Sequence, residues 1–323
     1  MFSKLISGCD LLNGYGTKLP YLAGCAYAMI FGLSFMFTKQ ALDDFPTLLL
    51  LAYRFSIASI LLAILAFTGI IKLQFSGKPW KTLLLLALFQ PVFYFICETL
   101  GIKLTSSSEA GIMIALIPVV VTLFAVIFIK ERPTLPQYFS IAASVAGVIF
   151  IVIMSGSFRL GTHFAGMLAL LGAVLSAGVF NILSRKLSQS FKPVEITFVM
   201  MCTGAFTFNG AFILQGISAG TLGKYVSAFR DPWAFVSVGY LGILSSVCAF
   251  FLVNYTLSKL SASRSTVFSN LTTVISIIAG VFVRHEPFYW YQLVGGIFIV
   301  AGVWGTNYFA KPVQTEQKEA AGA

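Results

Sequence analysis

The chain has 323 residues, of which 58% are hydrophobic and only 10% are charged, a balance that excludes an ordinary soluble globular protein. Spanning helices of about 20 residues each would use most of the chain and leave no room for a soluble catalytic domain. The net charge of +10 would indicate a nucleic-acid partner in a soluble protein, but in a membrane protein it indicates basic loops beside anionic lipid, so the lipid bilayer is the expected partner.

Apolar runs bounded by charges and turn residues predict ten transmembrane helices. The helices, in chain order, are predicted at 19–41, 46–70, 80–102, 105–130, 136–155, 164–185, 194–217, 233–257, 263–284 and 289–309. No run alternates polar and apolar residues as a barrel strand does, so the fold class is an all-α integral membrane protein. Lys and Arg gather in the loops on the side of the N-terminus. The flanking segments 1–18 and 311–323 are therefore both predicted to be cytoplasmic, with no cleaved signal peptide.

An internal repeat divides the chain. With a shift of 155 residues, Gln137 falls on Gln292, and the Ala-Gly-Val stretch 146–148 falls on 301–303. Each half carries five predicted helices, an odd number, so the second half enters the membrane from the opposite side and the repeat is inverted. Inverted repeats recur in secondary transporters, because two near-equivalent halves can exchange conformations. The predicted parts are a first repeat, a connecting loop and a second repeat, at 19–155, 156–163 and 164–310.

Six stretches carry a family resemblance. They are F-G-L-S-F-M-F-T-K (31–39), A-Y-R-F (52–55), the long segment L-T-S-S-S-E-A-G to I-K-E-R-P (104–133), L-G-I-L-S-S to S-A-S-R-S (241–265), H-E-P (285–287) and Q-L-V-G-G-I-F-I-V-A-G-V (292–303). In combination they resemble the EamA-type domain of the drug/metabolite transporter superfamily. The resemblance implies two five-helix repeats, a bacterial inner membrane, and export of amino acids or related metabolites. Relatives in the superfamily carry nucleotide sugars, phosphorylated sugars or drugs.

The sequence has none of the common catalytic signatures. There is no HExxH, no glycine-rich phosphate loop with GK[ST], and no G-x-S-x-G. The five cysteines have no CxxC spacing and mostly fall inside apolar runs, which indicates core packing and not a disulfide or metal site. We therefore expect no enzyme activity, no cofactor and no metal. A membrane-embedded enzyme is the alternative outside transport.

Polar side chains on the third predicted helix mark a candidate binding face. Gln90, Tyr94 and Glu98 follow one another at intervals of four residues, beside the break that Pro91 makes in the helix. A glutamine in hydrocarbon needs partners, and a cavity that holds water or substrate supplies them. The alternative is that Gln90 bonds to a neighbouring helix as packing.

Other candidate binding residues lie on four more helices. Amides and hydroxyls can hold an amino or carboxyl group without a buried fixed charge, although each can instead make an interhelical hydrogen bond. The candidates on the first helix are Tyr27, Phe31 and Ser34, and those in the second half are Asn181, Asn254, Tyr255, Asn270 and Thr273.

Two charges and one proline are placed within predicted helices. Arg54 and Glu98 come to similar depths, so we expect them to form a pair, which is either static or part of an external gate or a proton-sensitive switch. Snorkelling of each side chain to the interface is the alternative. Pro118 removes a backbone hydrogen bond in the fourth helix and is a candidate hinge, with a simple packing kink as the alternative.

Two acidic residues occupy equivalent turns of the repeat. Glu131 and Glu286 follow the fourth and ninth helices and are expected at the start of the next helix, where a carboxylate offsets the positive helix end.

Small residues on the fifth and tenth helices permit close helix contact. The contact is either internal or between two protomers, so a homodimer stays an open alternative. These residues are Ala143, Gly147, Gly295, Gly296 and Gly302.

The sequence thus favours a secondary transporter that moves a small neutral or zwitterionic organic solute by alternating access. The candidate residues are aromatic, amide and hydroxyl, without the paired Lys or Arg that phosphate recognition generally uses. Amino-acid or metabolite export comes from the resemblance alone. A drug or cation carrier is the alternative within transport.

Overall fold

The structure is a computed structural model, and every regular element among its described residues is a helix. The described residues are 19–129, 134–154, 161–219, 232–260, 265 and 268–309. The α-helices are α2 (Leu19–Asp44), α3 (Thr47–Phe67), α4 (Trp80–Ala87), α5 (Tyr94–Leu104), α6 (Ser107–Ile114), α7 (Ile117–Ile129), α8 (Leu135–Met154), α9 (Thr162–Leu187), α10 (Pro193–Ala219), α12 (Pro232–Gly239), α13 (Phe250–Lys259), α15 (Phe268–Ile278) and α16 (Trp290–Tyr308). Three π-helical segments join some of them: η1 (Leu88–Phe93), η2 (Tyr240–Ala249) and η3 (Ala279–Val283).

Eight helical stretches of the described chain are long and apolar enough to cross a bilayer. The last two predicted spans correspond to Phe268–Val283 and Trp290–Thr306, which are apolar but shorter. A helix of about 16 residues reaches roughly 24 Å, which is less than the hydrocarbon thickness of roughly 30 Å. The all-α membrane fold is therefore confirmed, whereas ten crossings stay a prediction.

Contacts between helices follow the two repeats. We number the predicted spans 1 to 10 and exchange each span with its counterpart five places along. The pairs α3 with α10 (spans 2 and 7), α6 with α15 (4 and 9) and α8 with α16 (5 and 10) map onto themselves. The pair α5 with α9 (3 and 6) maps onto the contact of α2 with η2 and α13 (1 and 8). This internal exchange symmetry is what an inverted repeat requires.

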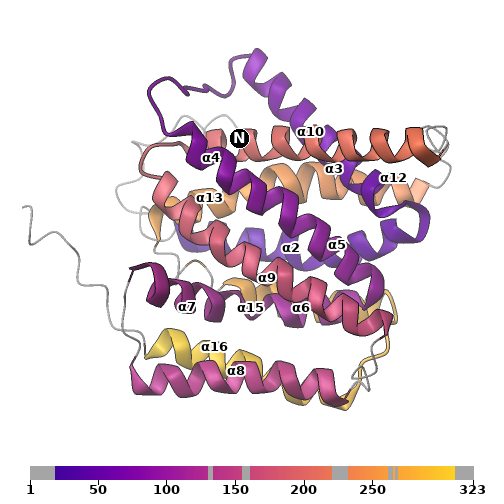
Figure 1. The fold of residues 1–323 in the computed structure, drawn as a ribbon, viewed down its shortest axis with the longest axis vertical. Helices are drawn as coiled ribbons and strands as arrows, with labels where there is room; N and C mark the ends of the chain where they lie inside the picture. Colours follow the sequence, from indigo (N-terminus) through magenta and orange to yellow (C-terminus); the bar gives the residue numbers. More distant parts are fainter. Residues whose placement is uncertain are drawn as a thin grey trace, which may run out of the picture.

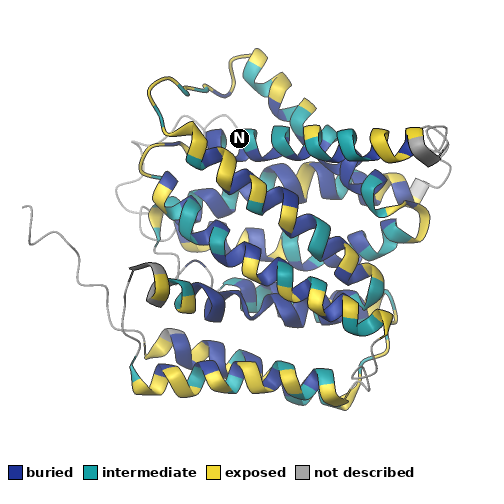
Figure 2. Cartoon of the chain, in the orientation of Figure 1, coloured by how far each residue is buried: buried dark blue, intermediate teal, exposed yellow. Residues whose placement is uncertain are grey.

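The helices lie side by side in layers, with α3 and α10 toward one edge and α8 and α16 at the other (Figure 1). Buried residues gather where the layers meet, and exposed residues line the outer helix faces (Figure 2). Large apolar side chains such as Phe67, Phe206 and Leu214 are exposed there. A continuous apolar exterior is expected of a protein whose solvent is lipid.

The third predicted span is broken at its middle, between α4 and α5. Gln90 has the non-helical dihedral angles φ −140° and ψ 111°, and η1 lies around it. Pro91 has no N–H to donate, and its ring disfavours the helical region for the residue before it. The break therefore follows from the sequence, and it turns the Gln90 side chain toward the interior, where it is buried.

The fourth predicted span is also broken, between α6 and α7. The chain makes a tighter turn here, in which the amide of Ala115 donates to Ile112 O at 3.2 Å and that of Leu116 to Met113 O at 3.0 Å. Pro118 cannot donate to the carbonyl of Ile114, four residues earlier. The missing N–H of Pro118 thus interrupts the helix about one turn before the proline itself.

Glycines bring α8 and α16 into backbone contact. A Cβ added at Gly147 would lie 2.7 Å from Gly295 O, and one added at Gly295 would lie 2.8 Å from Gly147 O. Gly302 is equally close to the backbone of Ser140. By contrast, a Cβ on Gly296 would meet nothing within 4 Å. Three of the predicted small residues, Gly147, Gly295 and Gly302, thus serve an internal helix pair, and a homodimer stays a prediction.

A buried carboxylate ties the loop after α3 to the start of α10. Glu195 has a fully buried side chain that accepts from Lys78 Nζ at 2.6 Å. It also accepts from the backbone amides of Gln74 at 2.9 Å and Lys192 at 2.8 Å. One carboxylate thus satisfies three donors from two segments.

We expect Glu195→Gln to lower stability by about 1–3 kcal/mol, because the amide cannot accept from all three donors and leaves at least one of them unsatisfied. The measurement is the thermal midpoint of the detergent-solubilised protein. Asp43→Asn is the matched control, since Asp43 is 61% exposed in its ion pair with Arg284 and should change stability by at most about 1 kcal/mol. Equal midpoints for the two variants would contradict the anchoring role of Glu195.

Candidate functional site

A cavity of about 80 Å³ lies between the two repeats. Spans 1 to 4 of the first repeat and spans 6, 8 and 9 of the second line it. The lining residues are Tyr27, Phe31, Ser34, Phe35, Arg54, Gln90, Tyr94, Phe95, Glu98, Ile114, Ile117, Ala177, Phe180, Asn181, Phe250, Val253, Ser269 and Thr272.

Eight of the residues singled out from the sequence meet in this cavity. They are Tyr27, Phe31, Ser34, Arg54, Gln90, Tyr94, Glu98 and Asn181. The four-residue spacing on the third helix does place its members on one wall. Several lining residues were not singled out, chiefly Phe35, Phe95, Phe180, Phe250, Ser269 and Thr272. Phe35 follows Phe31 at the same four-residue spacing, and that spacing was the available signal for it.

Four predicted binding residues do not line the cavity. Asn254 has no exposed surface and is engaged by neighbouring helices: its Oδ1 accepts from Ser184 Oγ at 2.7 Å, and its Nδ2 donates to Thr197 Oγ1 at 3.0 Å. Thr273 Oγ1 donates to Gly111 O at 2.7 Å. For these two residues the interhelical packing alternative describes the observed contacts. Tyr255 and Asn270 also lie outside the lining.

Arg54 is 1% exposed, and hydroxyl groups of η2 hold its guanidinium. Its Nε donates to Ser246 Oγ at 2.8 Å, and its Nη2 donates to Ser245 Oγ at 2.7 Å. The guanidinium carbon lies 4.2 Å from the centroid of the Phe95 ring, a cation–π distance. Two serines and a ring thus fix the cation at the cavity wall.

The expected direct Arg54–Glu98 ion pair needs correction. Among the described residues, the ion pairs within 4.0 Å do not include these two side chains. The reason is that the serines of η2, about 190 residues further along the chain, take the guanidinium instead. The two charges still interact across the cavity. Neither side chain snorkels, since both are buried.

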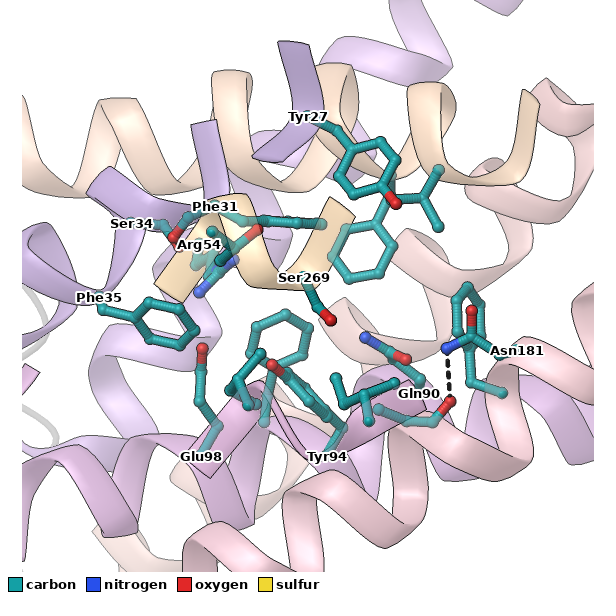
Figure 3. Close-up of a pocket in the computed structure, with 18 residues that line it drawn as sticks. Tyr27, Phe31, Ser34, Phe35, Arg54, Gln90, Tyr94, Glu98, Asn181 and Ser269 are labelled. Atoms are coloured by element: carbon teal, nitrogen blue, oxygen red, sulfur yellow. Dashed lines mark hydrogen bonds between the residues drawn. The ribbon is translucent and has the colours of Figure 1, made fainter. Parts of the chain in front are cut away.

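Two acceptor atoms at the cavity have no partner among the described residues. They are Gln90 Oε1 and Glu98 Oε2, on side chains that are 6% and 2% exposed. Figure 3 shows both side chains directed into the space that Ser269 also faces. Buried polar groups are usually hydrogen-bonded, so these two acceptors are places where a water or a solute can donate a hydrogen bond.

Aromatic rings form the rest of the wall. The Phe250 ring meets Phe31 at a centroid distance of 5.2 Å, Phe95 at 5.9 Å and Phe180 at 6.2 Å. Tyr27 stands at the edge, where its hydroxyl donates to Ser265 O at 2.7 Å. Such edge-to-face packing makes a preformed apolar surface that can take an apolar group of a ligand.

Pro118 is not itself a lining residue, but Ile114 and Ile117 on either side of the α6–α7 break line the cavity. A change in angle at this break would move both side chains. The hinge role of Pro118 therefore stays a prediction, and it now concerns a helix that forms part of the wall.

Glu286, in the loop between η3 and α16, connects this loop to the start of α6 through hydrogen bonds at one end of the bundle. The carboxylate accepts from the backbone amides of Ser107 at 3.1 Å and Ser108 at 3.0 Å, and from both hydroxyls at 2.7 and 2.8 Å. Burial raises the pKa of Glu286, but these hydrogen bonds outweigh it and lower the pKa below its usual value. The carboxylate does offset a positive helix end, as expected, but that end belongs to α6 of the other repeat and not to α16. Glu131 lies outside the described residues.

A second cluster lies at the same end. Glu109, on α6, accepts from Gln292 Nε2 of α16 at 3.0 Å and lies 3.1 Å from His163 Nε2 of α9. It joins helices of both repeats, so this end is closed by polar contacts that an opening motion would have to break. No group of three or more metal-binding side chains occurs among the described residues.

Cysteine accessibility separates lining residues from packing residues. In a background without native cysteines, we expect Ser34→Cys and Gln90→Cys to react with a small thiol reagent, because both side chains face the cavity. Asn254→Cys is the matched control and should be inert, because its site is closed by Ser184 and Thr197. Equal labelling at all three positions would contradict the placement of the cavity.

Comparisons with known proteins agree with this architecture. The EamA-like transporter family matches residues 18–153 and again residues 164–308. The "Uncharacterized transporter YcxC" of Bacillus subtilis is 38% identical over 287 residues, which cover 89% of this chain and 92% of that protein. The "WAT1-related protein At1g44800" of Arabidopsis thaliana is 24% identical over 315 residues, which cover 87% of this chain and 82% of that protein.

A solved crystal structure also has the same fold. It superimposes with a TM-score of 0.66 at 17% sequence identity, and the match covers 91% of this chain and 99% of the other. The family matches the chain twice, which agrees with the two repeats. The chain is a multi-pass membrane protein that belongs to the EamA-like transporter family.

Proposed function

We propose that the protein is a secondary transporter for a small neutral or zwitterionic organic solute, an exporter of amino acids or related metabolites, which works by alternating access. Membership of a transporter family excludes the enzyme alternative. The observation that supports the proposal is the central cavity between the repeats, which combines aromatic walls with one fixed cation and two unpartnered acceptors.

The charges of the cavity favour a solute that carries both an amino and a carboxyl group. The guanidinium of Arg54 can take a carboxylate, while Glu98 and Gln90 can take an ammonium group. A zwitterion would thus satisfy both kinds of protein group at once. The rings around Phe250 would accept an apolar side chain.

Alternating access is supported by where the helices break. The interruptions at Gln90 and at the α6–α7 turn lie beside the cavity, one in each of two neighbouring spans. Breaks of this kind let half-helices move relative to each other around a fixed site. The polar contacts of Glu286 and Glu109 would then close one end and release in the alternate state.

Counterflow in liposomes tests the proposal. Purified protein is reconstituted into vesicles loaded with one unlabelled compound, and uptake of the same compound in labelled form is followed. The panel of compounds consists of amino acids, nucleosides and cationic dyes. We expect uptake of at least one amino acid well above that of protein-free vesicles. Exchange of dyes alone would instead support the drug or cation carrier, which the aromatic walls and the carboxyl group of Glu98 also suit. No exchange of any member would contradict transport of these solutes.

We also propose a bacterial inner-membrane location with both termini in the cytoplasm, because basic residues such as Lys72, Lys78 and Lys186 lie on the side predicted to face inward. A reporter that is active only in the cytoplasm, fused after Ala323, should be active. The same fusion after Gly161 is the control and should be silent. Reversed activities would invert the topology.

A further inference from the structure

Glu98 is a charged residue type in an environment that does not compensate a charge. Its side chain is 2% exposed, and Oε2 has no hydrogen-bond partner among the described residues. An ionised carboxylate that is buried without a partner is strongly unfavourable, and a protein usually answers by neutralising it. The carboxyl therefore needs either a proton or a cation beside it.

The neighbouring cation is already engaged. Arg54 gives its Nε and one Nη2 donor to the serines of η2 and lies over the Phe95 ring, and it comes no closer to Glu98 than the 4.0 Å limit of an ion pair. The guanidinium therefore lies near Glu98 but forms no ion pair with its carboxylate. The guanidinium cannot follow Glu98 through a conformational change while the serines hold it.

Among the described residues, the other charged or titratable groups around Glu98 are phenols and one lysine that is engaged elsewhere. Tyr94, on the same helix, and Tyr27, on α2, are neutral phenols at the cavity, and Tyr240 of η2 faces Arg54. Lys39 of α2 points its Nζ to the carbonyls of Ile102 and Thr105, at 2.8 and 2.6 Å, at the end of α5.

The helices α9 and α6, which pack on other faces of α5, also place no cation beside Glu98 among the described residues. From α9, the uncharged residues Gly166, Leu170 and Gly172 lie against α5 and the segment just before it. Glu109 of α6 is engaged by Gln292 and His163. Glu98 thus has two ways to become neutral, a proton or the ammonium group of a solute.

We propose that Glu98 is the coupling residue of transport, holding a proton in the empty cavity and exchanging it for the ammonium group of the solute. This rests on the transport function proposed above. The step is balanced: Glu98–COOH and R–NH₃⁺ give the ion pair Glu98–COO⁻···⁺H₃N–R, and the proton leaves to water on the side to which the cavity is open. Only the two neutral forms, protonated or solute-bound, cross between the inward-open and outward-open states.

The consequence is obligatory exchange. One proton moves in one direction for each amine-bearing solute that moves in the other. For a zwitterion of no net charge, each cycle carries one positive charge against the solute, so a membrane potential that is negative inside drives the solute outward. Gln90 Oε1, the second unpartnered acceptor, would bind the same ammonium group without titrating.

The first test needs no solute. Purified protein is titrated from about pH 5 to about pH 9 by infrared difference spectroscopy, which detects the carbonyl stretch of a protonated carboxyl group. We expect a protonated band at neutral pH in the wild type that is lost in Glu98→Gln and kept, with a shifted titration, in Glu98→Asp. An identical neutral-pH band in wild type and Glu98→Gln would overturn the proposal.

The second test follows proton release on binding. An equimolar mixture of the standard amino acids is added to the protein in weakly buffered detergent solution with a pH-sensitive dye. We expect about one proton released per protein in the wild type and none in Glu98→Gln. The amine-free acids acetate, propionate and 4-methylpentanoate are the control and should release none.

The outcomes separate this proposal from the transport function. Equal proton release by wild type and Glu98→Gln, or amino-acid counterflow that a pH gradient cannot drive uphill, would overturn the role of Glu98 while transport stands. Absence of counterflow for every amino acid would overturn the proposed function itself, and the infrared titration would still decide whether Glu98 holds a proton.

Discussion

Valine at Gly295 is expected to separate α8 from α16 and to destabilise the protein by about 3 kcal/mol or more. A Cβ at this position would lie 2.8 Å from the backbone oxygen of Gly147 and closer still to the Ile151 side chain. Overpacking usually costs about 1–3 kcal/mol when side chains can adjust. Here a backbone oxygen stands in the way, so the whole helix must move and the cost should reach the upper end of that range or beyond.

The adjacent glycine provides the control for this prediction. A Cβ on Gly296 meets nothing within 4 Å, so Gly296→Val adds the same isopropyl group to the same helix and should leave the thermal midpoint almost unchanged. Both variants are compared by the fraction of monodisperse protein that survives heating in detergent. If both lose stability equally, helix propensity and not the crossing of α8 with α16 explains the effect.

Arg54→Leu should cause the largest loss of folded protein among changes at the cavity. It removes the donor to Ser245 and Ser246 and leaves Glu98 without the one cation that moderates it. Truncating one member of a buried charged network typically costs about 2–5 kcal/mol. That corresponds to roughly 30-fold or more in the ratio of folded to unfolded protein. The readout is the yield of monodisperse protein at a fixed expression level.

The double variant Arg54→Leu with Glu98→Leu distinguishes electrostatic coupling from two separate packing losses. Because the second change also removes the buried carboxyl group that shares the cavity with Arg54, we expect a higher yield than for Arg54→Leu alone, although transport stays lost. Residues that share a network give such non-additive effects, whereas independent sites add. Strictly additive losses would mean that the two charges do not sense each other across the cavity.

Much of the helix pattern could be predicted from the sequence, because apolar length and the need to satisfy the backbone leave few choices in hydrocarbon. The break at Pro91 could also be predicted, because a proline has no backbone N–H and interrupts the helix close to its own position. The break before Pro118 was placed less well: the residue that loses its partner lies four positions earlier, so the turn forms at Ala115 and Leu116. The ten-span count depends on two helices that are apolar but short.

The cavity was harder to predict than the helices. Spacing identified the wall at Gln90, Tyr94 and Glu98 because these polar groups stand out on an apolar helix. Asn254 stood out equally, yet it packs against Ser184 and Thr197, which lie 70 and 57 residues away in the chain. A helix that is apolar all round carries no sign of which polar residue faces a cavity and which faces a neighbour. The partners of Arg54 were unpredictable for the same reason.

The cap that Glu286 places on α6 has a consequence for how the protein is made. Ser108 and Glu286 are 178 residues apart, so at roughly 5–20 residues per second the ribosome needs roughly 10 to 35 seconds to supply the carboxylate after the serine. During that interval the amides of Ser107 and Ser108 must bind water, lipid head groups or the insertion machinery. The first repeat thus completes one of its own helix ends only after nearly the whole second repeat has been synthesised, which makes the last hairpin of the chain a late step in the biogenesis of the first half.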